Sequence, residues 1–136
     1  MKTREPTLQE IDELVSFLPR LYAEGVAAIE RWDGGAQRED GISTIPWPEY
    51  REVVREFFRL ASGECWSDYD YRAEKAGQML ENDEFMKAAD LGEIKTMLTY
   101  CVRGERFCDG HWGVMIEGGH VLRLLQRLAE LASNNA

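Results

Sequence analysis

Apolar residues recur at the spacing of one helix face along most of this chain. Between Tyr50 and Ala61 they follow the i, i+3, i+4, i+7 pattern closely. Pro48 suits the first position of that helix, where its missing N–H costs nothing, and Ser62-Gly63 suits its end. No stretch alternates apolar and polar residues over the length of a strand. The sequence therefore predicts an all-α fold of about five to seven helices in a single compact domain.

Local signals mark where other helices start and stop. Thr7 with Glu10, and Asp90 with Glu93, have the pattern of a capping box. Pro19 is expected to end or kink the first helix. A second helical run is expected up to about residue 31, a polar loop at 33–45, and further helices at about 69–81, from 90 toward 108, at 111–117 and from 120 onward.

The acidic balance of the chain limits its partners. The length of 136 residues fits one domain, residues 1–136, and the formal net charge is −9. All of that excess acid lies in residues 1–90, whereas residues 91–136 carry equal numbers of acidic and basic side chains. Because an acidic body repels nucleic-acid phosphates, nucleic acid is not expected as the main partner.

The sequence also indicates a compartment. No apolar run approaches the roughly 20 residues of a membrane helix, and the amino-terminal residues lack the apolar core of a signal peptide. Three cysteines make a disulfide framework unexpected, so reduced thiols are the default. We therefore expect a cytoplasmic protein without a membrane partner, and homo-oligomerisation stays open.

The densest group of chemically active residues lies between Cys101 and Trp112. Here Arg103 and Arg106 share one helix face, with Asp109 and His111 close by. Two guanidinium groups could clamp a carboxylate or phosphate, with His111 as a proton donor. Alternatively, the arginines of the neutral C-terminal third could pair with carboxylates of the acidic first 90 residues and with exposed helix-end carbonyls, and serve the fold alone. The sequence leaves both interpretations open.

Two cysteines and two histidines could form a different site. Cys108 and His111 have a usable zinc spacing, with Cys101 and His120 as further candidates. However, structural zinc sites come as two tight pairs, and Cys101 falls on an apolar helix face. A nucleophilic Cys108–His111 pair would need an exposed thiol with a lowered pKa. We expect no metal and no cofactor.

Aromatic and acidic residues alternate from Cys65 to Tyr71. Together with Trp47 and Tyr50 they could line a ligand pocket. In the plainer interpretation, Ser67 and Asp70 serve the start of the next helix. If Asp70 reached Arg103 or Arg106, this stretch and the arginine segment would form one site.

A resemblance rests on Val102-Arg103, Arg106-Phe107-Cys108 and Gly110-His111, followed by a leucine- and arginine-rich terminal helix. On these residues the chain resembles a family of uncharacterised bacterial domains, over about residues 46–131 and not over 1–45. The resemblance implies a small helical intracellular protein of bacteria. It implies no activity, so it assigns no catalytic residue.

The common enzyme motifs are missing from the sequence. It contains no HExxH, Gly-x-Ser-x-Gly, GxGxxG or Cys-x-x-Cys pattern. We therefore expect a non-catalytic helical domain that binds a protein partner or a small anionic ligand near Arg103–His111. The alternative is a small hydrolase or transferase for a phosphorylated or carboxylated molecule. There Arg103 and Arg106 would bind the anion, and Asp109 or His111 would move the proton.

Overall fold

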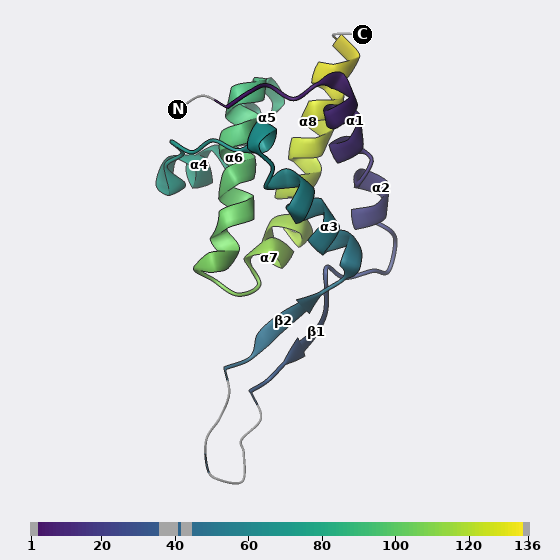
Figure 1. Cartoon of the computed structure of the whole chain (residues 1–136), viewed down its shortest axis with the longest axis vertical. Coiled ribbons are helices and arrows are strands. Elements are labelled where there is room, and N and C mark those ends of the chain that lie inside the picture. The colour runs from purple at the N-terminus through teal and green to yellow at the C-terminus, as the bar shows by residue number, and fades with distance from the viewer. Residues whose placement is uncertain (1–2, 36–40, 42–44, 135–136) are drawn as a thin grey trace.

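The computed structural model describes residues 3–35, 41 and 45–134. It is mostly helical and confirms the predicted fold class, although it adds a two-stranded sheet (Figure 1). The helices are α1 (Leu8–Val15), α2 (Leu18–Leu21), α3 (Glu52–Ala61), α4 (Ala73–Leu80), α5 (Asp83–Ala88), α6 (Leu91–Arg103), α7 (His111–Glu117) and α8 (His120–Asn134). Short 3-10 turns lie at Glu64–Trp66 and Gly104–Arg106.

Both capping boxes form as predicted. The Thr7 hydroxyl accepts a hydrogen bond from the Glu10 backbone N–H at 3.1 Å, and the Glu10 carboxylate accepts one from the Thr7 N–H at 2.9 Å. Asp90 and Glu93 repeat this exchange at the start of α6. These exchanges satisfy donors that a helix leaves open at its first turn, which is why the two starts are legible in the sequence.

Helix α6 lies at the centre of the molecule. It packs against α3, α4, α7 and α8, and α8 packs in turn against α1 (Figure 1). The buried side chains form a single cluster that includes Leu14, Phe57, Leu98 and Leu125. Because Ile11, Leu14, Phe17, Leu21 and Ala28 all belong to it, the amino-terminal helices are an integral part of the core.

The second helical run, predicted up to about residue 31, extends only to Leu21, where α2 ends, and a β-hairpin begins at Ile29. Strand β1 (Ile29–Asp33) pairs antiparallel with β2 (Trp47–Tyr50), and Trp32 stands opposite Pro48. Gly25, with a φ of +76°, lies in the turn that separates α2 from β1. Figure 1 shows the hairpin projecting from the end of the molecule opposite the two termini.

Three other boundaries differ from the prediction. Pro48 does not open a helix: it lies in β2, where a two-stranded sheet tolerates proline, and α3 begins four residues later at Glu52. Ser67 does not cap α4, because the N-cap of that helix is Arg72. The Ser67 hydroxyl instead donates to the carbonyl of Gly63 at 2.9 Å. Helix α6 ends at Arg103 rather than near Cys108.

None of the described helices is long and apolar enough to cross a membrane.

Candidate functional site

The turn between α6 and α7 is organised around one carboxylate. Oε1 of Glu105 accepts a hydrogen bond from the backbone N–H of Trp112 at 2.8 Å, and Oε2 accepts one from Gly110 at 3.0 Å. Glu105 therefore caps the amino terminus of α7 from outside the helix, where negative charge is also favoured by the helix dipole. Gly110, with a φ of +91°, allows the chain to turn into α7.

Tyr50 connects this turn to the hairpin. Its hydroxyl donates to Oε1 of Glu105 at 2.7 Å, and the ring is buried against Trp112 with the centroids 5.2 Å apart. Burial raises the pKa of Tyr50, and the hydrogen bond to Glu105 raises it further. Tyr50, predicted as a ligand residue, is thus a buried side chain whose hydroxyl supports Glu105 from beneath the surface.

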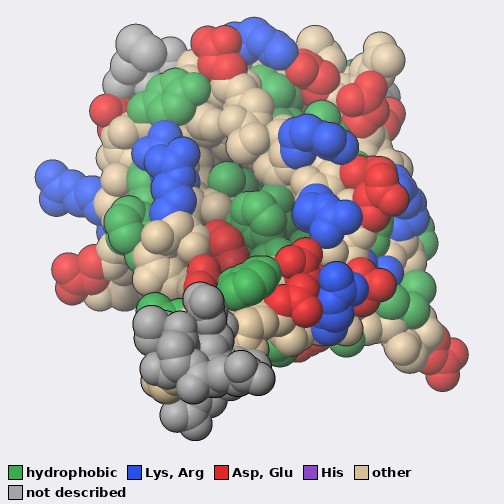
Figure 2. All heavy atoms as spheres, turned by 60° about the horizontal axis from the view of Figure 1, so that its bottom comes forward, with side chains coloured by type: hydrophobic (Ala, Val, Ile, Leu, Met, Phe, Trp, Pro, Cys, Tyr) green, Lys and Arg blue, Asp and Glu red, His purple; other side chains and the backbone are tan. Residues whose placement is uncertain are grey.

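Above this network, the surface between α3 and the α6–α7 turn is hollowed. Its floor is apolar, because the rings of Phe58 and Trp112 stack with centroids 4.5 Å apart and Val102 lies beside them. The hollow measures about 390 Å³. We call it the arginine depression, and it is lined by Arg55, Phe58, Arg59, Ser62, Val102, Glu105, Arg106 and Trp112. Figure 2 views the molecule from the hairpin side, where apolar side chains lie among basic and acidic ones.

The arginines of the depression are not neutralised. Among the described residues, none of Arg55, Arg59 and Arg106 has a carboxylate oxygen within 4.0 Å. In the described structure the guanidinium group of Arg55 donates to the backbone carbonyl of Tyr50. Elsewhere, Arg4 and Arg20 do form ion pairs, at 2.7 and 2.8 Å. Glu105 also lines the depression, and its oxygens accept hydrogen bonds from Tyr50, Gly110 and Trp112. With three arginines and one glutamate in its lining, the depression combines an apolar floor with an excess of positive charge in a protein that is acidic overall.

The structure separates the two arginines that the sequence grouped. Arg106 is exposed at the depression, whereas Arg103 lies over the rings of Tyr69 and Tyr71, at 5.6 and 5.5 Å from their centroids. Neither forms an ion pair with a carboxylate in the described part of the chain. For these two arginines the described structure therefore shows no pairing with the acidic body. Two other arginines of the C-terminal third do make such contacts: Arg123 pairs with Asp83 at 3.3 Å, and Arg127 donates to the carbonyl of Ala89 at the end of α5 at 2.9 Å.

His111 does not face the depression. Its ring packs on Gly104, where a Cβ atom would overlap the imidazole, and against Tyr100 at 5.2 Å between centroids. Burial lowers the pKa of His111, and contributions from the Tyr100 backbone and Glu105 oppose that shift only in part. Its Nε2 is buried and has no hydrogen-bond partner among the described residues. Asp109, by contrast, is exposed at the turn.

The remaining predicted residues lie elsewhere. Trp47 is on the hairpin, half-exposed, and its indole N–H donates to Glu49 at 3.0 Å. Asp70 lines a different pocket, described below, with Lys95. The sequence predicted a single site if Asp70 reached Arg103 or Arg106. In the structure the rings of Tyr69 and Tyr71, on either side of Asp70, contact Arg103.

The candidate zinc ligands are not brought together. Cys101 is fully buried, Cys108 is exposed, and the His111 ring is packed on Gly104. Over residues 3–35, 41 and 45–134, no group of three or more His, Cys, Asp or Glu side chains could hold a metal ion.

A family model covers almost the whole chain: the family of unknown function DUF6508 matches residues 6–134. The chain belongs to this family. The match extends beyond the predicted 46–131 and includes α1 and α2, in agreement with their part in the core. Comparison with curated proteins and with solved structures found no match. The bacterial origin expected from the resemblance stays a prediction.

Sequence reasoning overlooked most of the depression in this DUF6508 domain. Arg55 and Arg59 stand at i and i+4 on the polar face of the strongest predicted helix, which is the usual pattern of a solvated surface. Their position next to Arg106 depends on how α3 packs against α6, and no local signal encodes that packing.

Proposed function

We propose that this domain is a non-catalytic binding module, and that its arginine depression receives a segment of a partner protein. The segment would carry a carboxylate beside an aromatic or branched apolar side chain. One observation supports this most directly: three guanidinium groups without carboxylate partners in the described structure surround an apolar floor.

The chemistry of the lining matches that of protein interfaces. Arginine and large aromatic residues supply much of the binding energy at such surfaces, and guanidinium groups bind carboxylates in a fixed two-pronged geometry. Phe107 follows Arg106 in the chain, is 83% exposed and would offer a further apolar contact outside the lining of the depression. Trp32 of the hairpin lies against Gly110 on the same turn.

The enzyme alternative has less support. A hydrolase or transferase would need an acid or base near the bound anion. His111 is packed on Gly104, away from the depression, and burial favours its neutral form. Asp109 is exposed at the turn and does not line the depression.

The proposal can be tested with the capped tripeptide Ac-Glu-Phe-Glu-NH₂ as a probe. Titration into the purified domain, followed by the indole N–H resonance of Trp112, is expected to give a saturable shift. The neutral peptide Ac-Gln-Phe-Gln-NH₂ should bind roughly tenfold more weakly, because it lacks the charge-assisted hydrogen bonds.

Matched variants locate the site. The double variant Arg59→Gln/Arg106→Gln is expected to weaken binding of the acidic peptide by about tenfold or more. Arg72→Gln removes an exposed arginine outside the depression and should have no effect. Equal binding of the two peptides, or equal loss in the Arg72→Gln variant, would contradict the proposal.

A further inference from the structure

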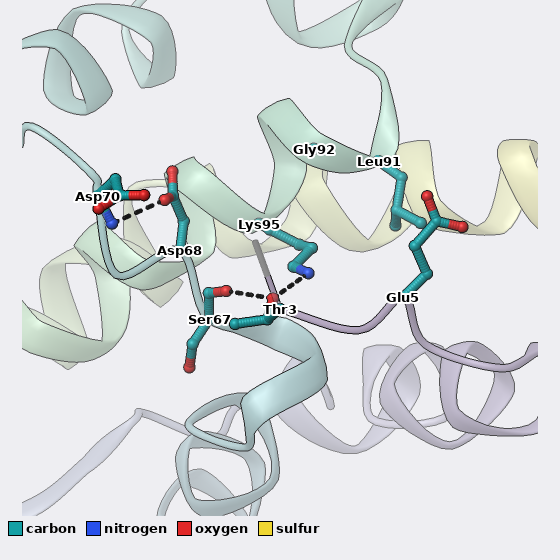
Figure 3. A pocket seen from close by; sticks show the side chains of 8 residues that line it. All are labelled: Thr3, Glu5, Ser67, Asp68, Asp70, Leu91, Gly92 and Lys95. Carbon is teal, nitrogen blue, oxygen red and sulfur yellow. Dashed lines mark hydrogen bonds between the residues drawn. The ribbon is translucent and has the colours of Figure 1, made fainter. Parts of the chain in front are cut away.

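A second pocket lies beside the amino-terminal half of α6, around a buried lysine. Lys95 is only 7% exposed although it carries an ammonium group. The pocket measures about 330 Å³ and is lined by Thr3, Glu5, Ser67, Asp68, Asp70, Leu91, Gly92 and Lys95 (Figure 3). This volume is at the lower end of the range for small-molecule sites, which limits the ligand to a small one.

Among the described residues, the hydrogen-bond partners of Lys95 are neutral and do not compensate its charge. Nζ of Lys95 donates to the hydroxyl of Thr3 and to the backbone carbonyl of Arg4, the latter at 3.2 Å. The Thr3 hydroxyl donates in turn to the carbonyl of Ser67 at 2.9 Å. Nζ thus has two neutral acceptors for its three N–H donors. No carboxylate oxygen of the described chain lies within 4.0 Å of Nζ. A buried ammonium without a counter-charge is costly, and a bound carboxylate would supply that charge.

The rest of the lining favours a positive group on the same ligand. Oδ2 of Asp68 accepts a bond from Thr96 at 2.6 Å, and Oδ1 accepts one from the Asp70 backbone at 3.0 Å. Each of these oxygens can accept another bond. The side chain of Glu5 has no hydrogen bond or ion pair with a described residue, and Figure 3 shows it beside Leu91, across the pocket from Asp68.

We propose that this pocket binds a small zwitterion of the amino-acid type. The carboxylate of the ligand pairs with Lys95 Nζ, and its ammonium group is held by Asp68 or Glu5. A simple carboxylate would pair with Lys95 but would be repelled by the carboxylates of Asp68 and Glu5, whereas a simple amine would be repelled by the buried ammonium group of Lys95. Only a ligand with both charges complements the whole lining.

The test uses the purified full chain and the protein amino acids, added one at a time, with thermal shift and isothermal titration calorimetry as readouts. At least one amino acid is expected to raise the melting temperature and to bind saturably. Its decarboxylated amine and its N-acetyl derivative each lose one charge, and should bind at least about tenfold more weakly.

Two variants test the position of the site. Lys95→Met should weaken binding at least about tenfold. Because this variant could fail to fold, Gly92→Leu is the second test: residue 92 lies in the first turn of α6, where a Cβ meets only ordinary contacts, and the longer side chain would fill the pocket. Glu24→Gln, on an exposed turn, is the control.

The outcomes are decisive in both directions. Loss of binding in Gly92→Leu, with binding retained in Glu24→Gln, supports the proposal. It is overturned if no amino acid binds the wild-type chain, if the amine or the acetylated derivative binds equally well, or if folded Lys95→Met or Gly92→Leu keeps full affinity.

Discussion

The hydroxyl of Tyr50 donates a 2.7 Å hydrogen bond to the carboxylate of Glu105, and this contact joins the hairpin to the α6–α7 turn. The same carboxylate accepts bonds from the backbone N–H groups of Gly110 and Trp112. Trp112 in turn stacks on Phe58 at the floor of the arginine depression. The position of this floor therefore depends on a buried network that the surface does not reveal.

The first prediction concerns that network. Tyr50→Phe removes one donor to a part-buried carboxylate, and should lower the free energy of unfolding by about 1–2 kcal/mol. Urea denaturation measures the change. Tyr69→Phe, at an exposed ring, is the control and should change stability by less than about 0.5 kcal/mol. Equal effects of the two variants would show that the Tyr50–Glu105 bond contributes nothing measurable.

A second prediction rests on the close packing of Gly104 and His111. A Cβ on Gly104 would overlap the imidazole ring, so Gly104→Ala should destabilise the fold by about 1–3 kcal/mol. His111→Ala removes the ring, and the double variant should recover part of that loss because the two effects are coupled. A double-mutant cycle measures this. Strictly additive effects would contradict the described packing.

The lowered pKa of His111 makes stability depend on pH in a known direction. Because burial disfavours the charged imidazole, the folded state binds fewer protons than the unfolded state around the usual histidine pKa of about 6.5. The contribution of His111 is therefore present above that pH and is lost as pH falls below it. Urea midpoints of wild type and His111→Asn at about pH 7 and pH 5 test this. The wild type should lose more stability on acidification than the variant does; equal losses would count against a buried, neutral histidine.

Arg106 provides a fourth test, of its role in folding. It is exposed and has no carboxylate within 4.0 Å in the described chain, so Arg106→Ala should change the free energy of unfolding by no more than about 0.5 kcal/mol. A loss of several kcal/mol would restore the interpretation in which this guanidinium group stabilises the fold by pairing with a buried carboxylate.

The three cysteines should differ sharply in reactivity. Cys108 is exposed, whereas Cys65 and Cys101 are buried, and burial raises the pKa of the Cys101 thiol to about 12. A disulfide reagent should therefore label one thiol rapidly in the native protein and all three in denaturant. Cys108→Ser should abolish the rapid phase. Rapid labelling that persists in this variant would mean that the core opens readily around the other two.

Local rules account for the parts of the fold that the sequence predicted correctly. The capping boxes at Thr7 and Asp90 involve partners three residues apart, and the apolar face of α3 repeats at helical spacing. The hairpin escaped prediction for the opposite reason. Ile29 pairs with Tyr50 across the chain, and a short strand with few alternating residues has no periodic signal of its own.

The candidate site shows the same difference between features that depend on nearby residues and features that depend on distant ones. The sequence singled out Arg106 within a dense run of functional groups, and the structure places it on the arginine depression. The sequence did not single out Arg55, Arg59 or Lys95. In a helix, the sequence alone does not distinguish an unpaired or buried cation from other charged residues, because the difference depends on its neighbours in space.

By itself, the sequence determined the helical class, the two capped helix starts, the main apolar faces and the acidic balance of this domain. These features depend on residues within a few positions of one another. Only the tertiary structure decided which cations lack a carboxylate partner among the described residues, that His111 is packed on Gly104 and that Lys95 is buried in a pocket. Burial and charge pairing depend on contacts between distant segments, and the free energy of the whole fold selects those contacts.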